Sequence, residues 1–297
     1  MSARDQLLVV IDPVARRTDG ESVRIAKDVL SAGAAVRVCL PEGPEDFTKA
    51  LARRGARRLV VIGDDRALLR AVGVLHRERE LAGCVLSVVP VGAAQTLARG
   101  LGVPAGAVAA ARAVLEGAER RLDLLVDDSD GVVLGDLRIP PVGGGGSFGA
   151  VGSSVGGPER VAAGASGEGH AWLRSCQSFV RTLAALPALP VRPARTFATA
   201  GGSSPVRLRV EADGVTLVDL DQPVRGVRVT AGCEGFAQVE VRPLSVGAEV
   251  APVRVRARAV TVSGADFRYR ADAVVAGPVR TRTWTVRGAA WGLVLPR

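Results

Sequence analysis

Two short polar turns in the first third of the chain are the residues best placed to do chemistry. Residues 63–67 read Gly-Asp-Asp-Arg-Ala, and residues 92–96 read Gly-Ala-Ala-Gln-Thr. Each turn follows an apolar run, residues 59–62 or 86–89, that is typical of a buried parallel strand, and each precedes a segment with helical spacing. Because open α/β sheets bind ligands just beyond the carboxyl ends of their strands, both turns are predicted to lie at a ligand-binding edge.

The elements around these turns alternate between apolar runs and helical spacing, which predicts a doubly wound α/β domain with a parallel sheet. Strands are predicted over residues 7–11, 36–40, 59–62, 86–89 and 122–126. Helices are predicted between them, over residues 21–32, 44–54, 66–80, 94–100 and 107–117. The helix over residues 66–80 is expected to have Asp64 or Asp65 as its N-cap.

The composition limits the class of protein and its partners. The chain has 297 residues, of which 47% are hydrophobic, so it is long and apolar enough for two domains that each bury a core. Its formal net charge is +9, carried almost entirely by arginine. A basic surface favours phosphate-bearing partners such as a nucleotide, a nucleic acid or an anionic lipid. An arginine-rich composition spread over a solvated surface would give the same net charge.

The cysteines and histidines predict neither a disulfide nor a zinc site. Cys39, Cys84, Cys176 and Cys233 are far apart, and His76 and His170 are isolated. The first residues, with an acidic side chain just before a short apolar run, are not typical of a signal peptide. No apolar run approaches the roughly 20 residues needed to cross a bilayer. A cytoplasmic location is expected, with peripheral association at the inner membrane face as an open alternative.

The pattern changes after Asp130. Residues 143–169 are rich in Gly, Ser and Ala, residues 172–186 have helical spacing, and residues 187–204 resemble a linker. From residue 206 the apolar period drops to two, and Asp213-Gly214 predicts a hairpin turn. Strands are predicted over residues 206–210, 227–230, 237–241, 253–262, 267–269, 279–286 and 291–295. The predicted organisation is an α/β domain over residues 1–127, a flexible insert with one helix over residues 128–205 and a β-sandwich domain over residues 206–297.

Alternating arginines in the last third form two predicted rows. Arg254, Arg256 and Arg258 share one strand face, and Arg280 and Arg282 share another. These rows are either a solvated outer face or a surface that docks to an anionic membrane or a phosphate. Nucleic acid is the least favoured partner, because no aromatic residues alternate with the arginines to stack on bases.

The order of these features resembles the diacylglycerol kinase catalytic family, which includes bacterial lipid kinases and sphingosine kinase-like enzymes and has an architecture similar to that of the NAD kinases. Residues 90–104 match the family pattern PLGTGNDFARSLGIP at seven positions: Pro90, Gly92, Ala98, Arg99, Leu101, Gly102 and Pro104. Residues 61–67 lie where the family has VxGGDGT, and residues 267–272 resemble the strand before its DGE. The resemblance covers about residues 7–127 and 206–297.

The resemblance implies an ATP-dependent kinase that transfers a phosphoryl group to a lipid hydroxyl with the help of Mg²⁺. It implies Asp272 and Asp65 as catalytic carboxylates, and no metal ligand is assigned. It implies that the nucleotide-binding residues are Gly63, Asp64, Asp65, Arg66, Gly92, Ala93, Gln95 and Thr96.

The sequence departs from the family pattern in all three of these segments. In the first turn, Asp64 and Arg66 replace glycines that let the backbone approach phosphates, and Ala67 replaces a threonine. Arg66 either pairs with a phosphate or forms a salt bridge to a neighbouring aspartate and fills the pocket. The second turn has lost a threonine, a glycine, an asparagine and an aspartate, and Thr96 is expected to cap the helix that follows. In the third segment, Val274 replaces the glutamate, so Asp272 either acts alone or is an ordinary turn residue.

Two interpretations of function follow. The first is an ATP-dependent lipid kinase with unusual loops, whose activity is weak or lost. The second is a non-catalytic protein of the same fold that binds a nucleotide, an anionic lipid or a protein partner. A homodimer is a further partner hypothesis.

Overall fold

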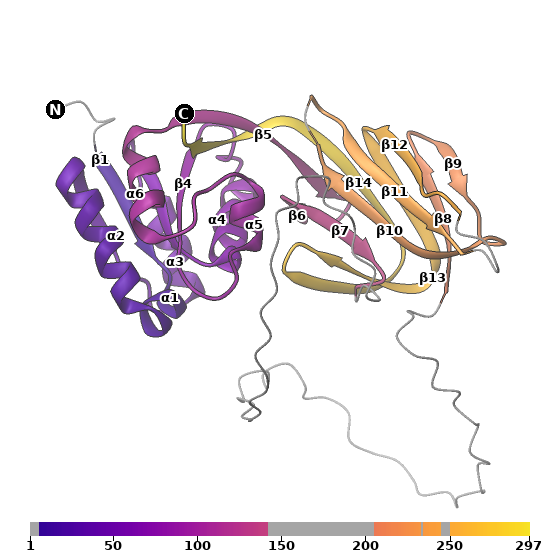
Figure 1. Cartoon of the computed structure of the whole chain (residues 1–297), viewed down its shortest axis with the longest axis horizontal. Coiled ribbons are helices and arrows are strands. Elements are labelled where there is room, and N and C mark those ends of the chain that lie inside the picture. Colours follow the sequence, from indigo (N-terminus) through magenta and orange to yellow (C-terminus); the bar gives the residue numbers. More distant parts are fainter. Residues whose placement is uncertain (1–5, 142–204, 233, 245–249) are drawn as a thin grey trace, which may run out of the picture. The chain divides into compact units, whose positions relative to one another are not determined.

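The computed structural model describes residues 6–141, 205–232, 234–244 and 250–297 (Figure 1). In the α/β half, four parallel strands pair in the order β4-β3-β1-β2. These strands are β1 (Gln6–Ile11), β2 (Ala35–Cys39), β3 (Arg58–Gly63) and β4 (Val85–Pro90). The helices are α1 (Pro13–Thr18), α2 (Gly20–Gly33), α3 (Pro44–Ala52), α4 (Asp65–Arg77), α5 (Thr96–Gly100) and α6 (Ala107–Glu116).

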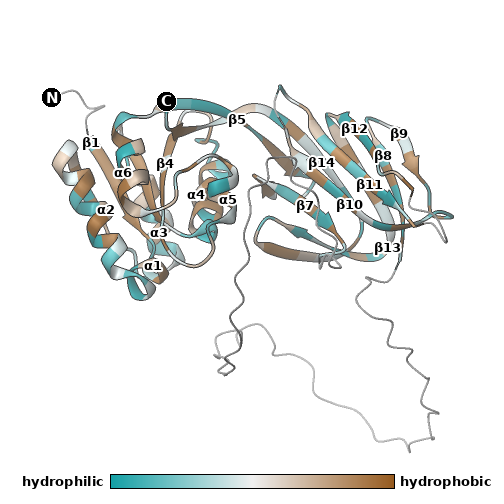
Figure 2. Cartoon of the chain, in the orientation of Figure 1, coloured by the Kyte–Doolittle hydropathy of each residue, from teal (hydrophilic) through white to brown (hydrophobic). Residues whose placement is uncertain are grey.

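The burial of each element explains its sequence pattern. Five of the six residues in β1, β3 and β4 are buried, which is why these strands are continuous apolar runs (Figure 2). The helices bury one stripe each; in α4 the stripe includes Leu68, Val72 and Leu75. The α/β class predicted from the sequence is therefore confirmed, and the short helix α1 is an addition that the sequence did not indicate.

A strand is present over residues 122–126, but the prediction that it joins the parallel sheet is wrong, because it runs antiparallel to its neighbour. In the structure β5 (Ala118–Asp127) pairs antiparallel with β14 (Val274–Leu295), and the end of β14 pairs in parallel with β4. The C-terminal strand therefore takes the place beside β4. It does so because Trp291, Leu293 and Leu295 complete the core of the α/β half.

The β-rich half is also confirmed. It contains β6 (Val132–Val133), β7 (Asp136–Ile139), β8 (Val206–Ala212), β9 (Val215–Val218), β10 (Pro223–Ala231), β11 (Ala237–Pro243), β12 (Val253–Ala257) and β13 (Ala259–Ala271), and it shares β14 with the α/β half. Strands β10, β7, β13 and β8 pair in a closed circuit, with β11 and β12 extending from β10. A second core fills this half, and its largest side chain is the buried Trp284.

The start of the predicted insert differs from the structure. Residues 128–205 were expected to form one flexible segment, but β6 and β7 lie within this range, where β6 pairs with β5 and β7 pairs with β10 and β13. Strands of two and four residues are too short for an alternating pattern to be visible in the sequence. The predicted helix over residues 172–186 and the linker after it lie outside the described residues.

Two further strand boundaries were predicted incorrectly. The run over residues 253–262 is divided at Arg258, because β12 pairs with β11 whereas β13 pairs with β8 and β14. Residues 279–286 and 291–295 form one strand, β14, which is interrupted by an irregularity near Ala289, where φ is +48°. The hairpin turn at Asp213-Gly214 is present, and both residues have positive φ as a two-residue turn of this type requires. Within the described ranges, no helix has the length and apolarity of a membrane span.

Candidate functional site

The two predicted turns meet at one edge of the parallel sheet. Strands β3 and β4 are neighbours, and Gly63 lies opposite Pro90 at their carboxyl ends. The backbone N–H of Asp65 donates to the carbonyl oxygen of Ala94 at 2.8 Å, and that of Val91 donates to Gly63 at 3.0 Å. Both turns therefore lie at the carboxyl edge of the parallel sheet, where the sequence predicted them.

Asp64 is the N-cap of α4, one of the two candidates that the sequence offered. Its Oδ1 accepts the backbone N–H groups of Arg66 at 3.0 Å and Ala67 at 3.2 Å. Free N–H groups at a helix start are the groups that bind an anion. In this chain the carboxylate of Asp64 already binds two of them.

Asp65 is buried and ties the first turn to the second. Its Oδ2 accepts the N–H of Leu97 at 2.8 Å, and its Oδ1 accepts that of Ala98 at 3.0 Å, so it caps α5 from a position 32 residues earlier. The expected cap, Thr96, is exposed, and the N-cap residue Gln95 makes no capping bond. The side chain of Gln95 instead donates to the carbonyl oxygen of Gly92 at 2.7 Å.

Close packing accounts for one glycine of these turns, and backbone conformation accounts for the other. A Cβ atom on Gly63 would lie 2.6 Å from the Cβ of Ala67 and 2.9 Å from that of Asp12, so no side chain fits there. Gly92 has φ of +111°, which L residues rarely adopt. Ala67 and Asp12 fill the space beside Gly63, so the absence of a side chain there serves internal packing.

Sequence analysis missed Asp12, which lies at the end of β1 beside the first turn. It is buried, caps α1 through Oδ2, and forms an ion pair through Oδ1 with Arg70 of α4 at 2.9 Å. The guanidinium of Arg70 also lies 5.4 Å from the centre of the Phe47 ring. The Asp-Pro pair that ends β1 was the one available signal, because an aspartate before Pro at a helix start is a typical N-cap.

Asp272 lies far from the two turns in sequence, in the turn between β13 and β14, and it is buried. Its carboxylate accepts three backbone N–H groups, from Leu134 at 2.8 Å, Gly135 at 2.8 Å and Asp136 at 3.0 Å. Burial raises the pKa of Asp272, although these three N–H donors oppose the rise. Its φ of +48° is a left-handed conformation that Asp tolerates better than most residues. The geometry is that of a structural turn residue.

A pocket of about 460 Å³ lies beside this turn. One wall is a stripe of α4 formed by Arg66, Leu69, Arg70, Gly73 and Arg77, which recur at helical spacing. The other wall is mostly apolar and consists of Val132, Val133, Tyr269, Ala271, Val274 and Ala276, with Asp127 and Gly131 at its edge. The pocket thus joins three arginines to an apolar surface.

The polar edge of this pocket is internally bonded. Asp127 accepts hydrogen bonds from Ser129 and Gly131 through Oδ1, and from the hydroxyl of Tyr269 through Oδ2 at 3.4 Å. Burial raises the pKa of Tyr269, so its hydroxyl is protonated and acts as a donor at neutral pH. His76 lies next to Arg77 in the last turn of α4, and its Nε2 lies 2.8 Å from Oδ1 of Asp130.

The family model of the diacylglycerol kinase catalytic domain matches residues 6–126. This region is therefore similar to the catalytic domain of diacylglycerol kinases. The match includes both turns and ends within β5.

Solved structures extend the similarity to the rest of the fold. A crystal structure of a diacylglycerol kinase from Bacillus anthracis str. Sterne is similar with a TM-score of 0.65 and 12% identity, covering 99% of this chain and 98% of that one. A second structure from the same strain, provisionally described as a diacylglycerol kinase, has a TM-score of 0.64 and 11% identity, covering 99% of each chain. At such identities the likeness establishes the fold alone. Curated protein sequences gave no match.

The two turns of this region do not fit nucleotide phosphates as they stand. Asp64 places a carboxylate on the N–H groups at the start of α4, and its negative charge repels a phosphate. Asp65 has both carboxylate oxygens bonded to N–H groups of α5. ATP and Mg²⁺ therefore stay predictions from the family, and no step of a reaction is derived through them.

The predicted site residues divide into two groups. Gly63, Asp64, Asp65, Gly92, Ala93, Gln95 and Thr96 belong to the two turns and do not line the pocket. Arg66 does line it, and its exposed guanidinium makes no ion pair with Asp64 or Asp65 among the described residues. Asp272 lies behind the pocket wall, whereas its neighbour Val274 lines the pocket.

The predicted arginine rows are changed by the structure. Arg258 lies between β12 and β13, so it is not part of the strand that carries Arg254 and Arg256. Its guanidinium lies over the ring of Phe236, as does that of Arg256. Arg282 is largely buried and forms an ion pair with Asp128, which leaves it unsuited to an external partner. Arg280 is exposed and lies 3.2 Å from Asp266.

Proposed function

We propose that this chain is a diacylglycerol kinase-family protein that has lost phosphoryl transfer and binds an anionic amphiphile. One observation carries the proposal. The carboxylates of Asp64, Asp65 and Asp272, which the family resemblance assigns to nucleotide binding and proton transfer, are all bonded to backbone N–H groups of the chain itself. The family glutamate is replaced by Val274, which cannot accept a proton.

The pocket beside α4 supports the ligand class. Arg66 and Arg77 offer guanidinium groups that bind phosphate oxygens in pairs, and the opposite wall offers valine, alanine and the ring of Tyr269. An amphiphile with one phosphate and a short apolar tail would use both walls, whereas a nucleotide would place its polar base and ribose against the apolar one. A lipid phosphate such as phosphatidate therefore matches this pocket best.

Thermal unfolding of the full chain separates the two ligands. We expect no rise of the melting temperature with Mg·ATP into the millimolar range, and a dose-dependent rise with dioctanoyl phosphatidate. A ligand at a hundred times its Kd adds about 2.7 kcal/mol of stability. The variant Arg66→Ala should weaken the phosphatidate effect about tenfold. Arg112→Ala, which removes an exposed arginine of α6, is the matched control and should leave it unchanged. A Mg²⁺-dependent rise with ATP would contradict the proposal.

Lipid phosphorylation tests the loss of transfer directly. We expect the native chain to show no transfer from ATP to dioctanoylglycerol above background. The triple variant Asp64→Gly, Arg66→Gly, Val274→Glu restores the two glycines and the carboxylate of the family pattern, and should raise the rate. Transfer by the native chain that the triple variant abolishes would show that the present turns are catalytic.

A further inference from the structure

Strand β12 lies at an edge of the β-rich sheet. It pairs with β11 on one side, and in the part of the chain that the structure describes no strand pairs with its other side. The pairing with β11 is antiparallel and regular from Val253 to Ala257. An edge strand presents a row of unpaired N–H and C=O groups. The free side of β12 therefore has the groups that bind a further strand.

The ladder identifies the residues of β12 whose backbone groups point to the free side. The carbonyl oxygen of Phe236 accepts a hydrogen bond at 3.1 Å from the residue that follows β10, so the backbone groups of Phe236 point toward β10. In an antiparallel ladder this direction alternates along each strand. The groups of Val239 therefore point toward β12, where Val239 pairs with Val255. Arg254 and Arg256, on either side of Val255, point to the free side.

The free stretch of β12 is short and has defined ends. Among the described residues, the backbone N–H and C=O groups of Arg254 and Arg256 have no hydrogen-bond partner. Arg258, the next residue that points the same way, is already bonded: its N–H donates to a carboxylate of the β8–β9 turn at 2.9 Å, and its carbonyl oxygen accepts an N–H of β14 at 2.8 Å. At the other end Pro252 has no N–H. The two arginines therefore offer one donor and one acceptor each.

The same two arginines have exposed side chains on the outer face of the sheet, 69% for Arg254 and 54% for Arg256. Nε of Arg254 donates to Glu240 at 3.1 Å, and Nη2 of Arg256 donates to Glu234 at 3.1 Å. The guanidinium of Arg256 also lies 4.9 Å from the centre of the Phe236 ring. The other N–H groups of both guanidinium groups have no hydrogen-bond partner within the described ranges. Because exposed ion pairs are weak, each arginine can bind a further carboxylate.

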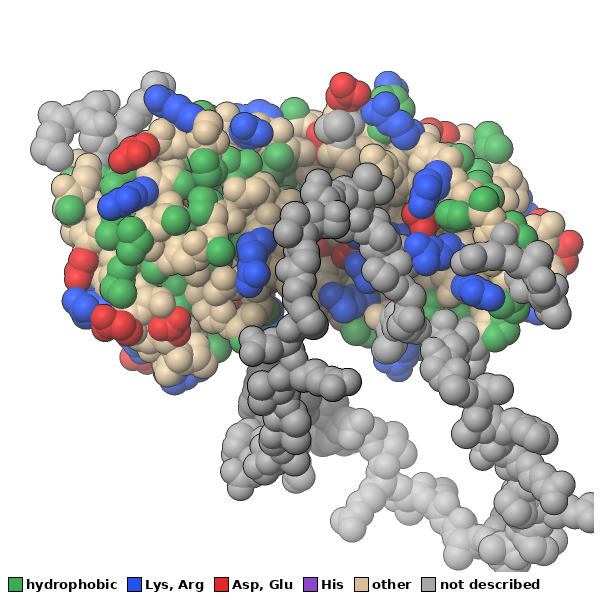
Figure 3. All heavy atoms as spheres, in the orientation of Figure 1, with side chains coloured by type: hydrophobic (Ala, Val, Ile, Leu, Met, Phe, Trp, Pro, Cys, Tyr) green, Lys and Arg blue, Asp and Glu red, His purple; other side chains and the backbone are tan. Residues whose placement is uncertain are grey.

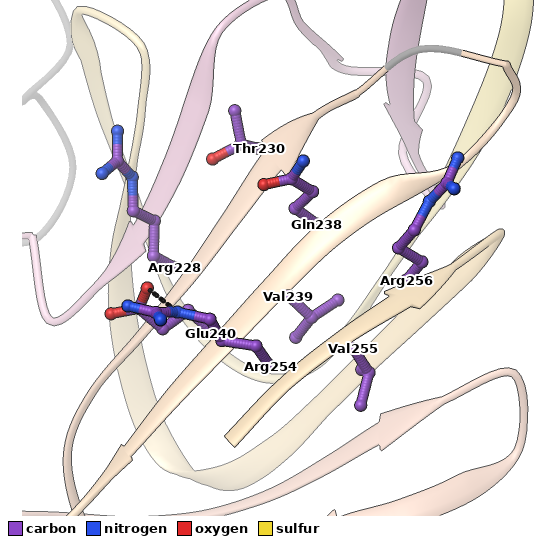
Figure 4. Close-up of a pocket in the computed structure, with 8 residues that line it drawn as sticks. All are labelled: Arg228, Thr230, Gln238, Val239, Glu240, Arg254, Val255 and Arg256. Carbon is purple, nitrogen blue, oxygen red and sulfur yellow. Dashed lines mark hydrogen bonds and ion pairs between the residues drawn. The ribbon is translucent and has the colours of Figure 1, made fainter. Parts of the chain in front are cut away.

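A shallow pocket of about 240 Å³ adjoins these arginines on the outer face (Figure 4). Arg254 lies on one side of it and Arg256 on the other, with the polar side chains of Thr230 and Gln238 between them. Basic side chains lie across this half of the molecule in the space-filling view (Figure 3). When a peptide adds to a sheet edge, main-chain hydrogen bonds give affinity and hollows for alternate side chains give specificity. The edge of β12 has both features.

We propose that β12 binds an extended acidic segment of another protein as an additional antiparallel strand. The residues opposite Arg254 and Arg256 would exchange N–H···O bonds with them, and their side chains would lie on the same face as the guanidinium groups. Acids at these two positions would form an ion pair with each arginine. The residue between them would face the other side of the sheet, beside Val255, which packs on the second core. The partner motif is therefore acid, apolar, acid.

Other occupants match this edge less well. In a second copy of β12 the residues that point outward are again arginines, and like charges directly opposite one another destabilise a sheet. A nucleic acid offers phosphate oxygens to the N–H groups, but its backbone has no N–H donors for the C=O groups. A peptide strand supplies donors, acceptors and carboxylates together. This binding does not depend on what the α4 pocket binds.

Fluorescence anisotropy of a labelled peptide with the full chain tests the pairing. The probe is the blocked peptide Thr-Val-Glu-Val-Glu-Val-Thr, and we expect it to bind more weakly as salt is raised. N-methylation of its two glutamates removes the N–H groups that face β12, and should weaken binding about tenfold or more. N-methylation of its last two valines, whose N–H groups face away from β12, is the matched control. This peptide has the same composition and charge, and its affinity should change less than about twofold.

Variants of the chain test the charges. An opposite-charge pair across two strands contributes up to about fivefold in affinity, so Arg254→Gln with Arg256→Gln should weaken probe binding up to about 25-fold. Arg209→Gln is the matched control, because Arg209 is also a strand arginine paired with a glutamate, but it lies on β8. Arg254→Glu with Arg256→Glu should reverse the preference, so that a probe with lysines in place of its glutamates binds more tightly. A damaged protein would not show this gain.

Three results would overturn the proposal. Equal binding of the two N-methylated peptides would show that the backbone of β12 takes no part. An effect of Arg209→Gln as large as that of the double glutamine variant would show that the charge effect is not local. Tighter binding of polyuridylate than of the acidic probe, lost in the double glutamine variant, would assign this face to a nucleic acid.

Discussion

Carboxylates in the polar turns and on the outer sheet face are held in opposite ways. In the turns, Asp64, Asp65 and Asp272 accept backbone N–H groups, which carry no net charge. On the sheet face, Asp136 and Glu240 each bind two arginines. The carboxylates of the turns therefore fix the backbone, whereas those of the sheet face hold charged side chains.

This difference between the two sets of carboxylates determines which groups of the α/β half are left to bind an anion. Helix starts and strand ends are the usual anion sites of an α/β domain, but here the chain supplies its own anions to them. The exposed arginines of α4 that line the pocket, Arg66 and Arg77, lie outside these helix-start N–H groups. An anion that binds the α/β half is therefore expected to contact guanidinium groups rather than the N–H groups of these turns.

The largest test of this comparison is Asp272→Ala. It leaves three N–H groups unbonded beneath the β13–β14 turn and places alanine at a φ of +48°. A buried donor without a partner costs about 1–3 kcal/mol, so we expect a loss of about 3 kcal/mol or more in urea unfolding. Because the partners are neutral, added salt should not change the loss.

Asp272→Asn is the matched control, since asparagine tolerates the same backbone and keeps one acceptor oxygen. Its loss should be clearly smaller. Burial raises the pKa of Asp272 in the folded state, so the stability it contributes is greatest below its unfolded pKa. The stability difference between native and Asp272→Asn protein should therefore fall as pH rises through the folded pKa. A loss below 1 kcal/mol for Asp272→Ala would show that water replaces the carboxylate.

A smaller effect is expected at Asp65. Asp65→Ala removes the cap of α5 and the tie between the two turns, which should cost about 2 kcal/mol in the same measurement. Asp64→Ala removes a more exposed cap and should cost about 1 kcal/mol. We therefore expect Asp65→Ala to lower the free energy of unfolding more than Asp64→Ala does. A greater loss for Asp64 would mean that the link between the turns contributes little.

The smallest effect belongs to the sheet face. Burial raises the pKa of Glu240, but hydrogen bonds from Arg242 and Arg254 outweigh it and hold the pKa below its ordinary value. The stability from this lowered pKa is present above the unfolded pKa of about 4.3 and is lost as pH falls through the folded pKa. Glu240→Gln should cost up to about 1 kcal/mol at neutral pH, and less in high salt. A loss that persists in acid would indicate packing rather than charge.

Features that depend on residues close together in the sequence could be predicted from local patterns. Apolar runs predicted β1, β3 and β4, because these strands are buried on both faces. Asp64 was one of the two predicted caps of α4, with Asp65, because an N-cap bonds to residues two and three positions later. The meeting of the two turns followed from the parallel order of the strands, which sequence alternation indicates.

Contacts between distant residues could not be predicted in this way. The partners of Asp272 lie 136 to 138 residues earlier, and those of Asp65 lie 32 and 33 residues later, so no spacing rule connects them. The positions of Arg228 and Arg270 on either side of Arg138 depend on the register of three strands. An alternating pattern shows which residues of one strand share a face, so the sequence predicted rows of arginines along strands and not these pairs across strands.

Strand β14 has a consequence for how the protein is made. Residues 291–295 fill the sheet position between β4 and β5, so the α/β half lacks an interior strand until those residues have left the ribosome. Until then β4 and β5 offer unpaired edges, which are prone to wrong pairing with other chains. Such a late long-range closure slows folding. The nascent chain is therefore expected to need a chaperone that shields these two strands until residues 291–295 have emerged.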